Sequence, residues 1–223
     1  MLKLISQTRM DDLVFQTTPD PLPPRKTMEK DLERSFVETL ARGLVSLPFD
    51  LKILLEAVSD PDLDREAREI AASAAVSIIA PREGNVEPYV RHSEDVLVLR
   101  LALRKILATG GEGVLAFRDR FSEDITRLTE ELDRLVRVCA PELVAWLDSR
   151  WAVLRKAVYA RKKIPMFVDN DEVGTWLYEE GLKFGTNYPI SEKTLEGRLK
   201  QAQPILDHLQ RKWDQDKKKI NPH

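Results

Sequence analysis

The sequence predicts an all-α protein, a multi-helix bundle built from helical hairpins. Only 9 of the 223 residues are glycine and 43% are hydrophobic, while the strong helix formers Leu, Ala, Glu, Lys and Arg are abundant. Apolar residues recur at three- and four-residue spacing, which is typical of amphipathic helices. Prolines and capping residues divide this pattern into segments of helical length. The composition therefore disfavours β-sandwiches and glycine-dependent nucleotide-binding folds.

Residues 1–26 are expected to form an arm or linker outside the bundle. Residues 17–26 contain four prolines, which fix φ and remove backbone donors, so an extended conformation is favoured. The segment 27–163 is the predicted helical bundle domain. The apolar period of the chain changes after the basic triplet 161–163 and Ile164-Pro165. Residues 164–223 are therefore predicted to be a small C-terminal helical subdomain.

Apolar periodicity and capping residues place the individual helices. A four-residue apolar period predicts a helix from Met28 to Leu47, which Pro48 ends, and Asp50 is a suitable N-cap for the next helix. Ser93 is the predicted cap of a strongly apolar helix that Gly110-Gly111 ends. The predicted helices after Pro48 are 51–58, a helix opened by Ser59-Asp60-Pro61 that runs to Ala80, 94–108, 122–139, 141–161, 171–184, a segment capped by Ser191, and a last helix near Pro204.

Charge and cysteine content limit the possible partners and compartments. The chain carries 35 basic and 37 acidic residues, a net charge of −2, so its overall charge does not favour the binding of a polyanion such as a nucleic acid. The single cysteine, Cys139, cannot form an intramolecular disulfide, which indicates a reducing compartment. No apolar stretch has the length of a signal peptide or of a bilayer span. We therefore expect a cytoplasmic protein without a membrane span.

The most distinctive pattern lies within residues 70–108. An apolar helix ends at Pro81, a loop containing Pro88 follows, and the acidic pair Glu94-Asp95 opens a second apolar helix. This pattern resembles the YkvA-like domain family, whose function is uncharacterised. The resemblance implies a bacterial helical hairpin and no particular reaction. The loop departs from the family's pattern at Arg82-Glu83-Gly84-Asn85, where that family usually has apolar residues and an early Asp.

Carboxylates and an imidazole come close together in the sequence around the acidic pair. The candidate metal ligands are Glu87, His92, Glu94 and Asp95. Their spacing matches no known tight metal motif, and acidic residues in the first turn of a helix are stabilised by the backbone donors without any ligand. A metal site and simple helix capping are both consistent with this pattern, and no cofactor is expected.

The C-terminal part contains a pattern similar to a helix-turn-helix. The helix capped by Ser191 would be the recognition helix, and the basic segments 161–163 and 217–219 could add phosphate contacts. The alternative is that these cations lie at solvated helix ends, where they are favoured by the helix dipole. The candidate nucleic-acid-binding residues are Lys193, Thr194, Arg198, Lys200, Arg161, Lys162 and Lys163.

The sequence contains no catalytic constellation. Its three histidines are far apart in the chain, and the glycine-rich stretch 110–113 lacks the Lys-Ser/Thr of a P-loop. We therefore expect a non-enzymatic helical scaffold or adaptor subunit of a bacterial complex, with a protein partner or a second copy of the chain bound to apolar helix faces. The alternative is a DNA- or RNA-binding regulator that uses residues 171–219.

Overall fold

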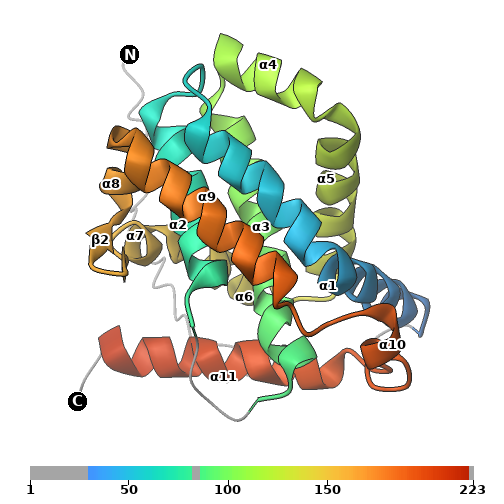
Figure 1. The fold of residues 1–223 in the computed structure, drawn as a ribbon. Helices are drawn as coiled ribbons and strands as arrows, with labels where there is room; N and C mark the ends of the chain where they lie inside the picture. Colours follow the sequence, from blue (N-terminus) through green and yellow to red (C-terminus); the bar gives the residue numbers. More distant parts are fainter. Residues whose placement is uncertain (1–29, 82–85, 221–223) are drawn as a thin grey trace, which may run out of the picture.

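A computed structural model of the protein describes residues 30–81 and 86–220 (Figure 1). The predicted arm at residues 1–26 and the loop segment 82–85 lie outside the described residues. The all-α prediction is confirmed, since the sheet found among the described residues is a single two-stranded hairpin. The elements are α1 Lys30–Ser59, α2 Arg65–Ile79, α3 Pro88–Thr109, α4 Glu112–Arg120, α5 Ser122–Val136, α6 Pro141–Ser149, α7 Trp151–Leu154, β1 Val158–Tyr159, β2 Lys162–Lys163, α8 Ile164–Asp169, α9 Asp171–Thr186, α10 Glu192–Leu195 and α11 Gln203–Ile220.

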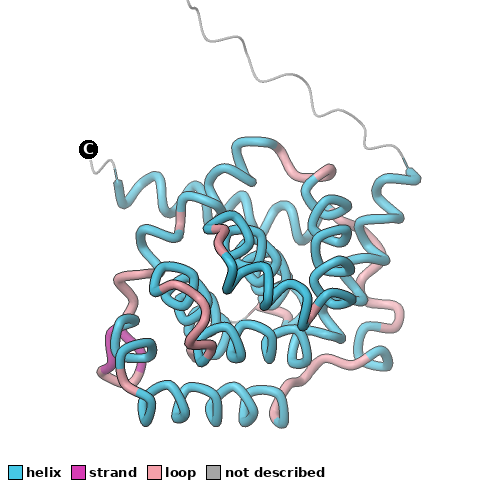
Figure 2. The backbone as a smooth tube through the Cα atoms, turned by 90° about the horizontal axis from the view of Figure 1, so that it is seen from above, coloured by secondary structure: helices cyan, strands magenta, loops and turns pink. Residues whose placement is uncertain are grey.

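Helices α1, α2 and α3 form the centre of the bundle, and the later helices cover them (Figures 1 and 2). The second half of α2 is rich in alanine, and its fully buried alanines leave little side-chain bulk between it and its neighbours. Helix α9 packs on α1 through glycines. A Cβ at Gly181 would lie only 2.4 Å from Leu55 Cδ1, and one at Gly185 would lie 3.4 Å from Pro48. Small residues therefore set how closely these helices approach.

The prediction that Pro48 ends the first helix is wrong, because α1 continues through it to Ser59. A proline inside a helix leaves the carbonyl four residues earlier without its backbone donor. In this protein the hydroxyl of Tyr188 donates to the Leu44 carbonyl over 2.8 Å and takes the place of the missing amide. Asp50 is consequently a buried residue within α1 and not an N-cap.

The prediction that Ser93 caps the third helix is also wrong. Helix α3 begins at Pro88, which occupies its first turn, so the acidic pair Glu94-Asp95 lies beyond that turn. The Ser93 hydroxyl donates to the Val90 carbonyl over 2.6 Å. The end of the helix is as expected, since Gly110 and Gly111 have φ of 75° and 91°, which favour glycine.

The predicted helix 141–161 is divided in the structure. It consists of α6, α7 and a hairpin in which Val158 pairs with Lys163 and Tyr159 with Lys162. The two turn residues, Ala160 and Arg161, have φ of 48° and 66°. The basic triplet 161–163 therefore lies on a β-hairpin that leads into the N-terminus of α8, and not at the C-terminal end of a helix.

The C-terminal third contributes to the same hydrophobic core as the rest of the bundle. Ile164, Phe167 and Leu177 are buried in one cluster with the central helices. The predicted subdomain 164–223 thus shares its core with the bundle over its described residues. Helix α11 lies along one side of the molecule and contacts α3 and α6 (Figure 1). Among the described residues, no helix combines the length and apolarity that crossing a membrane requires.

Candidate functional site

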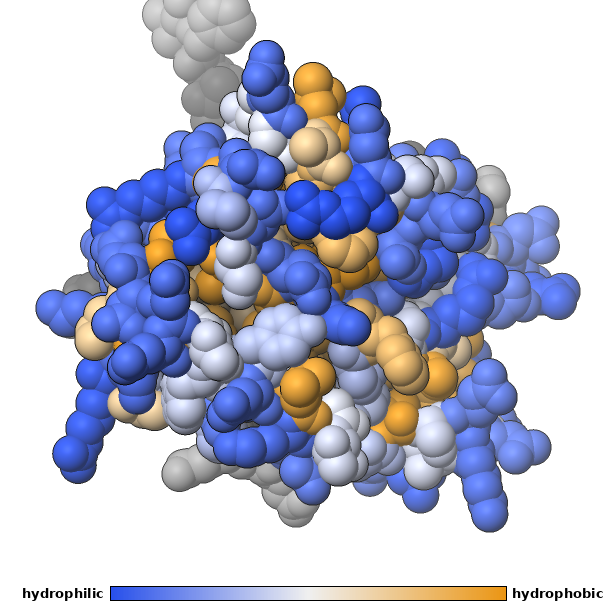
Figure 3. Space-filling model, turned by 45° about the horizontal axis from the view of Figure 1, so that its top comes forward, coloured by the Kyte–Doolittle hydropathy of each residue, from blue (hydrophilic) through white to orange (hydrophobic). Residues whose placement is uncertain are grey.

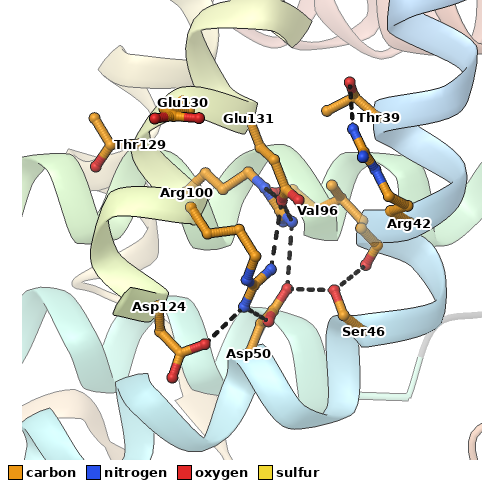
Figure 4. A network of polar contacts seen from close by, with 12 residues as sticks. Thr39, Arg42, Ser46, Asp50, Val96, Arg100, Asp124, Thr129, Glu130 and Glu131 are labelled. Atoms are coloured by element: carbon orange, nitrogen blue, oxygen red, sulfur yellow. Dashed lines mark hydrogen bonds and ion pairs between the residues drawn. The ribbon is translucent and has the colours of Figure 1, made fainter. Parts of the chain in front are cut away.

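A buried network of charges joins α1, α3 and α5 (Figure 4). Arg100 of α3 is 1% exposed and donates to Asp50 of α1 over 3.2 Å and to Glu131 of α5. Arg127, also on α5, donates to the other oxygen of Asp50 over 2.7 Å, and the Ser46 hydroxyl donates to Asp50 over 2.7 Å. Arg127 also donates to Asp124 over 3.0 Å, so two guanidinium groups and three carboxylates fasten the three helices together.

The local sequence makes room for this network. A Cβ at position 43 would lie 2.9 Å from Arg100 Nη2 and 2.8 Å from Val96 Cγ1, so glycine leaves the space that the guanidinium occupies. Burial lowers the pKa of Arg127, but the hydrogen bonds to Asp50 and Asp124 outweigh this effect and raise it, which keeps the guanidinium charged.

Three members of this network also line a groove of about 960 Å³ between α1, α5 and the region of α10. These are Ser46, Arg127 and Glu131, and Val45 and Leu195 are among the apolar residues of the lining. Because ion pairs within the protein hold one wall of the groove in place, the groove exists before any partner binds.

An exposed apolar surface continues from the groove along α1. Phe49 follows Val45 by one helical turn and is 79% exposed. Leu182 of α9 is 53% exposed. The Tyr178 hydroxyl donates to Glu56 over 2.9 Å, which joins the face of α9 that carries Leu182 to the face of α1 that carries Phe49. Phe49 and Leu182 are therefore exposed on the same side of the α1–α9 pair.

Exposed hydrophobic side chains are otherwise scattered. Figure 3 shows one face of the molecule, on which hydrophobic residues surface in small groups among hydrophilic ones. Large exposed hydrophobic residues also occur on α4, α7, β1 and α8. Single exposed apolar residues are normal on a protein surface, and Phe49 differs from the others in lying one helical turn beyond Val45 of the groove lining.

The four predicted metal ligands do not converge on one point. Glu94 is 1% exposed, and it accepts hydrogen bonds from Arg150 and from Lys212 of α11. Glu87 is exposed and lies 3.5 Å from Arg198. Within residues 30–81 and 86–220, no three His, Cys, Asp or Glu side chains gather as a metal site would require.

His92 and Asp95, the other two candidates, contact each other. The distance between His92 Nδ1 and Asp95 Oδ2 is 2.8 Å, and the Asp95 side chain is fully buried. The structure therefore separates the acidic pair into two roles. Glu94 binds cations from distant elements, and Asp95 binds a neighbouring imidazole.

The predicted recognition helix is only one turn long. Helix α10 spans Glu192–Leu195, and the Ser191 side chain and Thr194 form a capping box at its start, which confirms the predicted cap. Gly197 has a φ of 73° and follows the helix, so the chain leaves the helical path there. The helix predicted after the Ser191 cap therefore ends at Leu195, and one turn is too short for a recognition helix in a DNA groove.

The predicted nucleic-acid-binding residues lie in two separate regions. Lys193 lines the groove, Thr194 is used in the capping box, and Lys200 is exposed. The triplet 161–163 belongs to the hairpin, at the opposite end of the molecule from α10 (Figure 1). Lys162 Nζ lies 4.2 Å from the centre of the Trp176 ring. The two basic sets thus do not form one continuous surface.

Sequence reasoning missed the charge network and the exposed Phe49. One signal for the network was present, because Arg100 interrupts the apolar run of α3, and an arginine within a buried helix face requires an acidic partner. No local pattern identifies Phe49 as exposed, since it lies in an apolar stretch beside Pro48.

Comparison with known proteins gave no match to a family model, to a curated protein or to a solved structure. The resemblance of residues 70–108 to the YkvA-like domain family therefore stays a prediction.

Proposed function

We propose that this protein is a non-enzymatic adaptor or scaffold subunit of a bacterial complex, and that it binds a protein partner in the groove between α1, α5 and α10. The observation that carries the proposal is the 79% exposure of Phe49, one helical turn beyond Val45 of the groove lining. Exposed aromatic residues beside a preformed groove are characteristic of anchoring points in protein interfaces.

The charges around the groove favour a protein segment over a nucleic acid. Arg42 and Lys193 contribute positive charge to the lining, and Glu192 and Glu196 contribute negative charge. Because Arg127 and Glu131 of the lining also balance each other, the lining has no excess of cations for a phosphate backbone. An amphipathic segment with both charge signs fits this surface better. The nucleic-acid-binding alternative through residues 171–219 has less support, because the one-turn α10 carries Glu192 beside Lys193.

Photo-crosslinking in the native cell tests the proposal directly. A photoreactive phenylalanine analogue is placed at position 49 and, in a matched control, at Val153, which is 70% exposed on α7. We expect a discrete crosslinked species from position 49 and none of that mass from position 153. Absence of a crosslink at position 49, or an identical pattern at both positions, would overturn the proposal.

The substitution Phe49→Ser then measures how much the Phe49 side chain contributes to binding of the partner. Since the side chain is largely exposed, the free energy of unfolding is expected to change by less than about 0.5 kcal/mol. Binding to the purified crosslinked partner is expected to weaken by about 2 kcal/mol, the magnitude of an interface hot spot. If the crosslinked species is a second copy of the chain, light scattering of wild type and Phe49→Ser shows a dimer that the substitution dissociates.

A further inference from the structure

A separate cavity of about 370 Å³ lies where the ends of α2 and α9 meet the beginning of α3 and the hairpin. Ile78, Ile79 and Pro81 provide apolar walls, and the rings of Phe184 and Tyr188 provide aromatic ones. The volume falls at the lower end of the range of about 300–1,000 Å³ found for small-molecule pockets. The cavity is therefore large enough for a small organic ligand.

The polar centre of this cavity is His92, whose ring is fixed from three sides. The Asp95 Oδ2 atom lies 2.8 Å from Nδ1 of His92. The rings of Phe184 and Tyr188 contact the imidazole edge-on, with centroid distances of 5.9 and 5.1 Å. Side chains held in one orientation by packed neighbours are characteristic of binding sites, because little entropy is lost when a ligand is bound.

The second ring nitrogen of His92 is left for a ligand. An ionised carboxylate can only accept hydrogen bonds, so Asp95 fixes the proton on Nδ1. No group in the described part of the chain hydrogen-bonds to Nε2, and the side chain keeps 13% exposure while lining the cavity. Nε2 therefore faces a molecule in the cavity as an acceptor when the ring is neutral and as a donor when the ring is protonated.

The charges of the lining favour an anion. Arg91 and Lys183 are cationic, while Glu180 and the Asp95 carboxylate behind His92 are anionic, so the formal charge is +1 when His92 is protonated. Lys183 is 64% exposed and donates to Glu180 over 2.7 Å, and the Tyr159 hydroxyl donates to the other oxygen of Glu180 over 3.4 Å. The lysine thus lies at the rim on an exposed side chain that can turn toward a ligand.

We infer that this cavity binds a small planar organic carboxylate. Its carboxylate accepts a hydrogen bond from protonated His92 Nε2, so that the imidazolium lies between the ligand and Asp95, and Lys183 adds a second cation at the rim. Its apolar ring lies between the aromatic and aliphatic walls. This site is independent of the groove beside Phe49.

Benzoate serves as the probe, with benzamide as its uncharged isostere. The full chain is labelled with ¹³C-histidine, and the ring signals of His92 and His208 are followed during titration, with His92 assigned through the loss of its signals in His92→Gln. We expect benzoate to shift the His92 signals saturably and to leave those of buried His208 in place. Benzamide is expected to bind about tenfold more weakly, because a charge-assisted hydrogen bond is lost.

Two lysine variants keep the test decisive if His92→Gln fails to fold. Lys183→Met is expected to weaken benzoate binding several-fold, whereas Lys193→Met, at an exposed lysine of the groove, leaves it unchanged. The inference is overturned if the histidine signals show no saturable shift at tens of millimolar benzoate or if benzamide binds equally well. Equal weakening by the two lysine variants would reveal unspecific attraction of anions and would also overturn it.

Discussion

Removing one hydroxyl tests how α1 continues through a proline. Pro48 has no amide hydrogen, so the Leu44 carbonyl lacks its usual donor in the helix. The Tyr188 hydroxyl, 144 positions later in the chain, donates to this carbonyl over 2.8 Å. Tyr188→Phe removes only that donor and retains the ring that packs against His92 and Phe184.

The expected magnitude follows from the hydrogen bond. A neutral hydrogen bond contributes about 1 kcal/mol net, and a buried carbonyl left without a donor costs about 1–3 kcal/mol. We therefore expect Tyr188→Phe to lower the free energy of unfolding by about 1.5 kcal/mol. In a Pro48→Ala background, the new amide can donate to Leu44, so the same substitution should cost about 0.5 kcal/mol. The predicted coupling energy is thus about 1 kcal/mol.

Urea unfolding followed by circular dichroism measures this double-mutant cycle. Burial raises the pKa of Tyr188, so its hydroxyl stays protonated at neutral pH, where the cycle is measured. Tyr178→Phe is the matched control, because Tyr178 also joins α9 to α1 but donates to the Glu56 side chain. Its cost should be additive with Pro48→Ala to within about 0.5 kcal/mol. Equal costs of Tyr188→Phe in both backgrounds, or the same coupling in the control, would refute the reasoning.

Three further predictions concern the buried network and the single thiol. Gly43→Ala should lower the free energy of unfolding by about 1–3 kcal/mol in urea titrations, because the new Cβ overlaps the Arg100 guanidinium; an unchanged midpoint would contradict this. Asp50→Asn should cost about 3 kcal/mol by the same measurement, since buried Arg100 and half-exposed Arg127 both lose a charged partner, and a loss below 1 kcal/mol would show that Glu131 alone suffices. Burial raises the pKa of Cys139 to about 12 from an ordinary 9.0, so at mildly alkaline pH a thiol reagent should modify the native protein on the order of a thousandfold more slowly than the urea-unfolded chain. Comparable rates would show that the thiol is accessible.

The helices themselves could largely be predicted from the sequence, because their apolar periods and end signals are local. The segment from Ser122 and the stop at Gly110-Gly111 are examples. The continuation of α1 could not be predicted, since the group that compensates for Pro48 is Tyr188, far along the chain. The β-hairpin could not be predicted for a different reason. Its turn places Ala160 and Arg161 at positive φ, where Asn and Gly are the usual signals.

The candidate sites were predictable only in part. Glu94 and Asp95 were singled out as an acidic pair, but consecutive residues on a helix point in different directions, so the two carboxylates meet different partners. The charge of Arg100 within an apolar helix indicates an acidic partner, yet Asp50 and Glu131 lie 50 and 31 positions away and are identified only by the packing. The exposure of Phe49 is likewise a result of tertiary structure.

The position of Glu94 has a consequence for the order in which the chain can fold during synthesis. Its carboxylate is buried on α3, but its cations come from Arg150 and Lys212, which the ribosome adds 56 and 118 residues later. A carboxylate without its cations is unstable in an apolar interior. The two ion pairs of Glu94 can therefore be complete only after α11 has left the ribosome.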